Sequence, residues 1–183
     1  MAQSWRSGRG DARAARPLDD AALERIALRY VERYATTRAR LGAYLERKLR
    51  ERGWAGEAEP QPAMLAERFV ALGYVDDALY ASNRAASLTR RGYGPRRVAD
   101  SLRAAGIGAE DAAPAQSAAK EGAWDAALAF ARRKRIGPFA AAPTDRAARE
   151  KAFAALIRAG HDMNIARRIV RANPGDVPEP DEG

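Results

Sequence analysis

Apolar residues recur three and four positions apart through most of the chain. The clearest stretch follows the start of the sequence, where the apolar positions are Leu23, Ile26, Ala27, Tyr30, Val31 and Tyr34. Residues at this spacing share one side of an α-helix. The sequence has no run in which apolar and polar residues alternate strictly, the pattern that is typical of strands. The pattern therefore predicts an all-α protein.

Four helix endings share one local sequence, in which a large apolar residue is followed four positions later by glycine and then by a large side chain. The glycines are Gly53, Gly73, Gly106 and Gly160, and the intervals from 53 to 106 to 160 are 53 and 54 residues. Glycine ends a helix because it adopts the left-handed conformation without a Cβ clash. Helix ends on a fixed period predict a helical array, and such arrays usually present a surface to a partner.

Cap and turn signals predict about nine short helices in three groups of three. They cover about 18–34, 36–53, 63–72, 75–91, 95–106, 109–120, 122–135, 144–160 and 162–172. We expect Pro114 to interrupt the sixth helix, because an internal proline removes a backbone hydrogen bond. We expect a loop at 137–143, and an eighth helix that buries Ala152, Phe153 and Leu156.

Grouped by threes, the helices predict tandem three-helix repeats in an elongated, curved arrangement. The expected repeats are 18–74, 75–121 and 122–172. The basic segment 1–17 and the acidic tail 173–183 are expected to be disordered, because they are polar and lack apolar periodicity.

Charge favours an acidic partner. The chain has 32 Lys plus Arg and 24 Asp plus Glu, a net charge of +8, and most of its cations are arginine. Arginine suits phosphate and carboxylate, so nucleic acid and an acidic protein groove are both candidates. A coding bias that raises Ala, Arg and Gly together is the alternative source of this composition. Cysteine is absent, and no apolar run reaches the roughly 20 residues that span a bilayer, so we expect a cytoplasmic protein.

Catalytic patterns are missing from the sequence. His161 is the single histidine, and we expect it to pack on Leu156 at a helix end. The adjacent carboxylates Asp19-Asp20 and Asp76-Asp77 stand where helices begin, so capping explains them. No glycine-rich phosphate loop occurs in a strand–helix context. The sequence therefore predicts a binding protein without enzymatic activity, cofactor or metal.

The most specific local segment is Gly92-Tyr93-Gly94-Pro95-Arg96-Arg97. Proline is typical of the first helical position, and two arginines then fall in the first turn, where cations oppose the helix dipole. Either they face an acidic partner, with the free N–H groups of the helix start as an anion site, or they are solvated. Tyr93 either packs between helices or stacks on a base. A second candidate contact face lies on the second helix; its residues are Arg38, Arg40, Arg47, Lys48 and Arg50.

The central third of the chain resembles the RecX family. The residues that carry the resemblance are Gly73-Tyr74-Val75-Asp76-Asp77, then Tyr80-Ala81, then Arg91-Gly92-Tyr93-Gly94-Pro95-Arg96-Arg97-Val98, and then Leu102 and Gly106-Ile107. They match the order and spacing of that family's signature over about 35 residues. The candidate signature and partner-binding residues are Asp76, Asp77, Tyr80, Arg90, Arg91, Gly92, Tyr93, Gly94, Pro95, Arg96 and Arg97.

The resemblance implies a fold of tandem three-helix repeats and a function. RecX proteins bind the RecA recombinase in its filament on DNA, block extension of the filament, and lower ATP hydrolysis and strand exchange. They have no enzymatic activity of their own. Because they act on RecA, the resemblance implies a role in regulating recombination, DNA repair and the SOS response. The rival hypothesis is a sequence-independent DNA-binding helical protein that affects recombinases by competing for DNA. We expect a monomer under both hypotheses.

Overall fold

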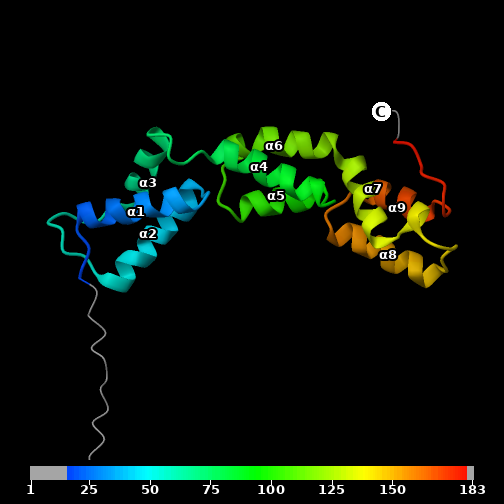
Figure 1. Cartoon of the computed structure of the whole chain (residues 1–183), viewed down its shortest axis with the longest axis horizontal. Helices are drawn as coiled ribbons and strands as arrows, with labels where there is room; N and C mark the ends of the chain where they lie inside the picture. The colour runs from blue at the N-terminus through cyan, green and yellow to red at the C-terminus, as the bar shows by residue number, and fades with distance from the viewer. Residues whose placement is uncertain (1–15, 181–183) are drawn as a thin grey trace, which may run out of the picture.

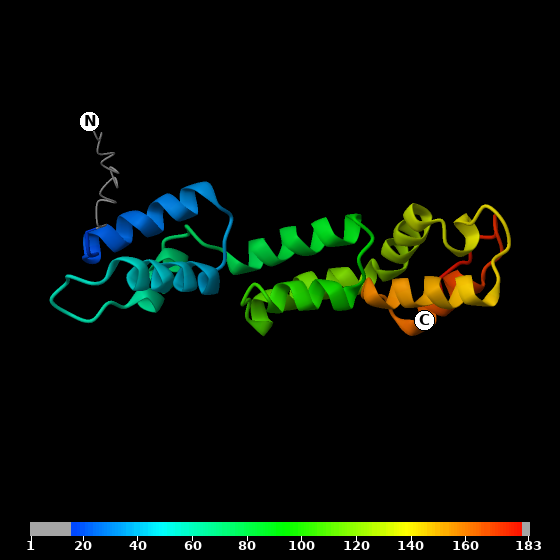
Figure 2. The ribbon, with the colours of Figure 1, turned by 90° about the horizontal axis from the view of Figure 1, so that it is seen from below.

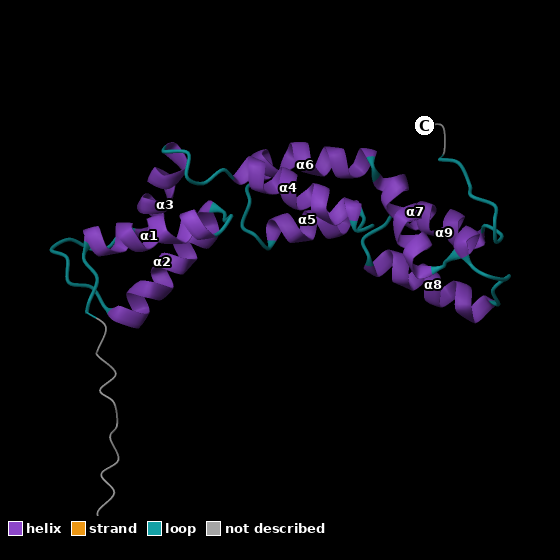
Figure 3. Cartoon of the chain, viewed as in Figure 1, coloured by secondary structure: helices purple, strands orange, loops and turns teal. Residues whose placement is uncertain are grey.

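The structure is a computed structural model that describes residues 16–180 (Figure 1). The described residues form nine α-helices and one 3₁₀ turn and no β-strand, so the all-α prediction is confirmed (Figure 3). In order, they are α1 (Asp20–Arg33), α2 (Arg38–Arg52), α3 (Pro62–Ala71), α4 (Asp77–Arg90), α5 (Pro95–Arg103), α6 (Ala109–Glu121), α7 (Ala123–Lys134), η1 (Gly137–Phe139), α8 (Arg146–Arg158) and α9 (Met163–Arg171).

The helices form tandem three-helix groups along an elongated molecule. Figure 1 shows the three groups end to end in a shallow arch, and Figure 2 shows the same succession from below. The second helix of each group, α2, α5 or α8, lies along the inner edge of the arch (Figure 1). Each group buries a separate cluster of apolar side chains, and Tyr93 contacts both the second and the third cluster. The predicted repeat architecture is therefore present, while the individual repeat boundaries stay predictions.

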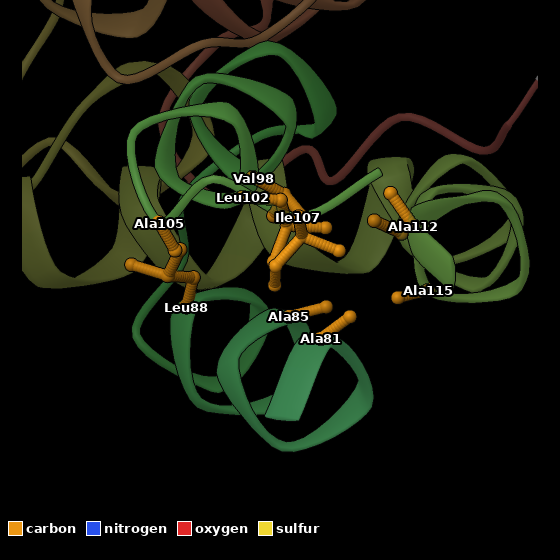
Figure 4. Close-up of a cluster of buried hydrophobic side chains, with 10 residues drawn as sticks. Ala81, Ala85, Leu88, Val98, Leu102, Ala105, Ile107, Ala112 and Ala115 are labelled. Carbon is orange, nitrogen blue, oxygen red and sulfur yellow. The ribbon is translucent and has the colours of Figure 1, made fainter. Parts of the chain in front are cut away.

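The middle core is built largely from alanine. Ala81 and Ala85 of α4 face Ala112 and Ala115 of α6, while Leu102 of α5 fills the space beside them (Figure 4). Small side chains allow two helices to approach closely, so a core with few large residues can still be closely packed. The composition, which is rich in alanine, is thereby explained by close helix packing as well as by helix propensity.

Pro114 does not interrupt the sixth helix, so that prediction is wrong. The helix α6 runs unbroken from Ala109 to Glu121 with Pro114 inside it. Pro114 is exposed, whereas Ala112, Ala115 and Ala119 are buried. Since the proline lies on the solvent side, water can satisfy the carbonyl that loses its N–H partner, and the buried face holds the helix together.

The third group departs from the sequence-based prediction in two details. The expected loop 137–143 begins with the 3₁₀ turn η1, which buries Gly137 and Pro138. Of the three residues expected to be buried in α8, Leu156 alone is fully buried, and Ala152 and Phe153 are half-buried. The helix α8 lies on one side of α7 and α9, so a wide stripe of its surface stays in contact with water.

The predicted helix endings are confirmed, with one variation. Gly73, Gly106 and Gly160 have φ of +77°, +72° and +93°, and the residue after each returns a hydrogen bond to the apolar residue at the start of the motif. Gly53 also has positive φ, but its carbonyl accepts from the N–H of Leu18 at 2.9 Å. The segment before α1 therefore closes the outer end of α2.

Of the two terminal segments that were expected to be disordered, residues 1–15 and 181–183 lie outside the described residues. Residues 173–180 form no helix, and two hydrogen bonds join them to the third group. The N–H of Gly175 donates to the carbonyl of Pro138 at 2.8 Å, and the Arg168 guanidinium donates to the carbonyl of Glu179 at 2.5 Å.

Candidate functional site

The two aspartates of the signature organise the start of α4. The Asp76 carboxylate accepts from the N–H of Leu79 at 2.7 Å and so caps the helix. Asp77 is buried, and its Oδ1 accepts from the N–H of Arg38, the first residue of α2, at 2.8 Å. This bond satisfies a backbone donor that has no partner within its own helix, so Asp77 connects the second repeat to the first.

The Gly92–Arg97 segment forms the contact between the second and third repeats. The N–H of Gly94 donates to the carbonyl of Ala159 at 2.9 Å, and the N–H of Arg96 donates to the carbonyl of Gly160 at 3.2 Å. The backbones touch so closely that a Cβ on Gly94 would lie 2.3 Å from the Gly160 oxygen, and a Cβ on Gly160 would lie 2.4 Å from the Arg97 nitrogen. Two glycines are therefore required where the end of α8 meets the start of α5.

The same arrangement recurs between the first and second repeats. The Thr37 hydroxyl at the start of α2 donates to the carbonyl of Ala105 at the end of α5, at 2.6 Å. A Cβ on Gly106 would lie 2.4 Å from the Cβ of Ala39. The end of α5 thus contacts the start of α2. In the same way, the end of α8 contacts the start of α5. We call these two contacts the repeat joints.

The repeat joints explain why arginines occupy the first turns of α2 and α5. The N–H groups of Gly94 and Arg96 at the start of α5 already bond to the carbonyls that follow α8, which leaves fewer free N–H groups for an anion than the first alternative requires. The negative end of the α8 dipole lies against this turn and favours the cations that the α5 dipole alone would disfavour. The first-turn arginines therefore need no acidic partner to be tolerated.

Four arginines gather around a groove beside the repeat joints. The groove has a volume of about 460 Å³ and is lined by Arg40, Arg84, Leu88, Arg91, Tyr93, Arg97, Asp100, Ser101 and Ala104. We call it the arginine groove. It draws side chains from α2, α4 and α5, and from the turn between α4 and α5, so it exists only when the first two repeats are assembled. Its guanidinium groups outnumber the single carboxylate of Asp100, and a groove with this balance suits an anionic ligand.

Aromatic rings position three of these four guanidinium groups. Those of Arg91 and Arg97 lie 5.5 and 6.0 Å from the centre of the Tyr93 ring. Arg40 lies 5.4 Å from the centre of the Tyr80 ring and also donates to the Tyr80 hydroxyl at 2.5 Å. Such contacts are favourable because the face of the ring is electron-rich. Tyr93 is half-buried between two apolar clusters, which supports the packing alternative for this residue.

The rest of the predicted basic face of α2 is paired with carboxylates. Arg38 is paired with Glu67 at 2.8 Å, Lys48 with Glu51 at 2.6 Å, Arg47 with Glu51 at 3.6 Å, and Arg50 with Glu46 at 3.8 Å. The pKa of Glu51 is lowered, first by its hydrogen bond to Lys48. Exposed pairs of this kind are weak, so they leave the cations accessible while reducing the net charge of the face. Among the five, Arg40 alone lines the arginine groove.

The structure separates the predicted signature residues into three sets. Asp76, Asp77, Gly92, Gly94 and Pro95 build helix starts and repeat joints. Arg91, Tyr93 and Arg97 line the arginine groove, and Tyr80 holds Arg40 beside it. Arg90 and Arg96 are exposed outside the groove lining.

Sequence reasoning missed Arg84, which lines the groove. Its Nε donates to the Ser101 hydroxyl at 2.8 Å. The available signal was the spacing of residues 84, 88 and 91, which are four and then three positions apart and therefore lie on one face of α4 and of the turn that ends it.

His161 is buried at the joint between the second and third repeats. Its side chain is fully buried, its Nε2 lies 3.1 Å from the carbonyl oxygen of Gly92, and its ring meets Phe130 edge-on at 5.6 Å. Burial lowers the pKa of His161, an effect that the hydrogen bond to Gly92 partly opposes. Among residues 16–180, no group of three or more His, Cys, Asp or Glu residues is arranged to hold a metal ion. Within the same residues, no helix is long and apolar enough to cross a membrane.

Comparison with known proteins identifies the family of the chain. The model of the RecX second three-helix domain matches residues 76–115, which span α4, α5 and the first half of α6. The chain is also 36% identical over 160 residues to the regulatory protein RecX of Myxococcus xanthus strain DK1622, covering 83% of this chain and 86% of the relative. The chain belongs to the RecX family. The resemblance that the signature residues carry is thereby confirmed.

Solved RecX structures share the fold. The crystal structure of RecX from Lactobacillus salivarius matches with a TM-score of 0.59 and 19% identity, over 82% of this chain and 94% of the other. A second crystal structure, of a regulatory protein RecX, matches with a TM-score of 0.55 and 21% identity, over 81% of this chain and 72% of the other. The tandem helical architecture is therefore common to this chain and RecX proteins that have diverged widely in sequence.

Proposed function

We propose that this RecX-family protein regulates the RecA recombinase without catalysing a reaction. It binds RecA and its filament on DNA and inhibits filament extension, ATP hydrolysis and strand exchange, so it modulates homologous recombination, DNA repair and the SOS response. The similarity to a protein named regulatory protein RecX supports the proposal. The proposal places the protein in the cytoplasm as a monomer, without a cofactor.

The observation that carries the proposal is the arginine groove on a bowed array of repeats. The inner edge of the arch is formed by α2, α5 and α8 (Figure 1), and two of these helices contribute to the groove. A filament repeats the same surface from one subunit to the next, so an elongated repeat protein contacts more than one subunit at once. Weak contacts by separate repeats then add through effective concentration.

The direct test is an assay of DNA-dependent ATP hydrolysis by the cognate recombinase. Protein added below the concentration of the recombinase should slow hydrolysis, because one bound molecule blocks extension of a whole filament end. An unchanged rate at equimolar protein would refute the proposed function. A pull-down of recombinase with and without single-stranded DNA then separates binding to the recombinase from binding to its filament.

Neighbouring arginines provide a matched pair of variants. Arg97 lines the groove and Arg96 does not, although both are exposed residues in the same turn. The variant Arg97→Glu should raise the concentration needed for half-maximal inhibition by about tenfold or more, which is on the order of 1.4 kcal/mol. The variant Arg96→Glu should change it much less. Equal effects of the two changes would place the contact face elsewhere, provided that circular dichroism shows unchanged helicity.

The groove also favours one rival, direct binding of DNA phosphates in competition with the recombinase. Four arginines around one groove are suited to a nucleic-acid backbone. DNA binding through many phosphates collapses as salt rises, whereas a protein contact with a packed centre weakens less. Tight, steeply salt-dependent DNA binding, combined with no binding to recombinase in the absence of DNA, would favour the rival.

A further inference from the structure

A second basic groove lies in the third repeat, at the opposite end of the molecule from α1 to α3 (Figure 1). It is formed by the end of α7, by α8 and by α9, and has a volume of about 370 Å³. Five cations line it: Lys134, Arg135, Arg149, Lys151 and Arg158. None of these residues belongs to the RecX signature, and none lines the arginine groove. We call this feature the distal groove.

The charges of the distal groove are not compensated from within. No carboxylate lines it among the described residues. None of its five cations forms an ion pair within residues 16–180, and Arg149 donates to the backbone carbonyl of Asp145 at 3.4 Å. Like charges around one groove repel each other and raise the local potential, an arrangement that attracts and orients an anionic ligand.

One of these cations occupies an unusual backbone conformation. Arg135 ends α7 with φ of +54°, the one non-glycine residue with positive φ among the described residues. A left-handed conformation is unfavourable for a residue that has a Cβ, by about 1 kcal/mol or more. The turn at Arg135 leads the chain from α7 to Ile136 and Gly137, which also line the groove. The basic residue therefore occupies a position where glycine or asparagine is the usual choice.

Apart from Gly137 and the polar residue Thr144, the rest of the lining is aliphatic. Ile136 and Val170 are buried, and Ala152 and Ala155 of α8 are half-buried. The lining contains no aromatic ring on which a base could stack, in contrast to the arginine groove with Tyr93. Non-specific binding of single-stranded nucleic acid depends on such rings together with basic residues. An aliphatic surface surrounded by cations is suited instead to a peptide that carries both aliphatic and acidic side chains.

The repeat symmetry shows that the start of α8 differs from the other two second helices. The first turn of α5 receives carbonyl oxygens from α8, and the residue before α2 donates to a carbonyl of α5. Within the described residues, the first turn of α8 makes no hydrogen bond to the end of another helix. Thr144, Ala148 and Arg149, at this turn, line the distal groove instead. This turn is capped locally instead, because the Asp145 carboxylate accepts from the N–H of Ala148 at 2.7 Å.

We propose that the distal groove binds an acidic peptide segment of a partner protein, in which carboxylates alternate with aliphatic side chains. The carboxylates pair with Lys151, Arg158 and Arg149, and an aliphatic side chain packs on Ile136 and Val170. The distal groove is separate from the arginine groove, so one partner can bind to both grooves at once. The proposal does not depend on the proposed function.

Fluorescence anisotropy tests the proposal with full-length protein and a fluorescein-labelled synthetic peptide that alternates glutamate with leucine. The double variant Lys151→Glu, Arg158→Glu should weaken binding by about tenfold or more, because two attractive charges become repulsive. The matched control is Arg25→Glu, Arg29→Glu, which makes the same charge change on two exposed residues of α1. It should weaken binding by less than about threefold. Circular dichroism checks that both variants are folded.

Four results would overturn the proposal. The first is equal loss of binding in the two double variants, which would mean that the peptide responds to net charge alone. The second is equal affinity for a peptide that has serine in place of leucine, since the aliphatic residues Ile136 and Val170 would then contribute nothing to binding. The third is a single-stranded oligonucleotide that binds more tightly than the peptide and loses affinity in the α8 variant but not in the α1 variant, which would assign the groove to nucleic acid. Sedimentation of the protein alone detects a second copy in the groove: self-association that the α8 variant abolishes would replace the partner peptide with another molecule of this chain.

Discussion

One added methyl group at Gly94 tests whether the repeats are joined by direct contact of helix ends. Gly94 has φ of −80° and ψ of 170°, a conformation that alanine adopts without strain. The effect of Gly94→Ala therefore comes from packing and not from the backbone preference of glycine. An added Cβ would lie 2.3 Å from the Gly160 carbonyl oxygen and 2.6 Å from the His161 nitrogen. Both neighbours are backbone atoms, so neither can rotate away.

The expected cost follows from the bonds that the contact holds. Relieving a 2.3 Å contact requires the α8 end to move by about 1 Å, because non-bonded heavy atoms prefer roughly 3.5 Å or more. The bonds from Gly94 to Ala159 and from Arg96 to Gly160, now 2.9 and 3.2 Å, are then stretched or broken. Each is worth about 0.5–1.5 kcal/mol net, and a polar group left buried and unpaired costs about 1–3 kcal/mol. We expect Gly94→Ala to lower the free energy of unfolding by about 2–4 kcal/mol.

Urea denaturation followed by circular dichroism measures this cost. A repeat protein that loses one interface also loses cooperativity, so the transition of Gly94→Ala should broaden or split as well as shift. Hydrogen exchange should show faster exchange in α8 and α9 than in α1 and α2. The matched control is Gly42→Ala: Gly42 lies within α2, and no atom lies within 4 Å of its added Cβ. This variant should be stabilised by about 0.5–1 kcal/mol, because alanine is the better helix former.

The two variants make the same chemical change and have opposite expected signs. If Gly94→Ala unfolds at the same urea concentration as the unchanged protein, with Gly42→Ala stabilised as expected, the repeat joint does not have the close contact described above. A loss of stability spread evenly over all nine helices in hydrogen exchange would also contradict a local joint, since the contact involves only the second and third repeats.

Other predictions concern the same joints. Because burial lowers the pKa of His161, the unfolded state binds its proton more readily, and stability should fall as pH drops below about 6.5, by at most about 1.4 kcal/mol per pH unit. Urea midpoints from pH 7.5 to 5 measure this slope, and a His161→Phe variant that keeps the same slope would exclude His161 as its source. Gly106→Val should destabilise by more than about 1 kcal/mol, because φ is +72° and the Cβ would meet Ala39. Gly53→Val, which has φ of +76° and no neighbour within 4 Å, should cost less, and equal thermal shifts for the two would argue against the first joint.

The helices and their order could be read from the sequence because their signals are local. Apolar residues three and four apart, aspartates at helix starts and Gly-ended turns each act within one or two turns of chain. The RecX signature could also be recognised from the sequence, because it is a run of residues at fixed spacing between 73 and 107. Pro114 misled the prediction because its effect depends on which side of α6 faces water, and that side is fixed by packing against α4.

The joints and the grooves were decided only by tertiary structure. Nothing local in Gly94 indicates a carbonyl that comes from residue 160, and nothing in Asp77 indicates a bond to the N–H of residue 38. The arginines of α2, α4 and α5 meet because consecutive repeats stack end to end, and the sequence alone does not state the angle of that stacking. The chain by itself therefore determined what each helix is and where it ends. The contacts between helix ends, which depend on distances between residues far apart in the chain, determined which charged side chains face a common ligand.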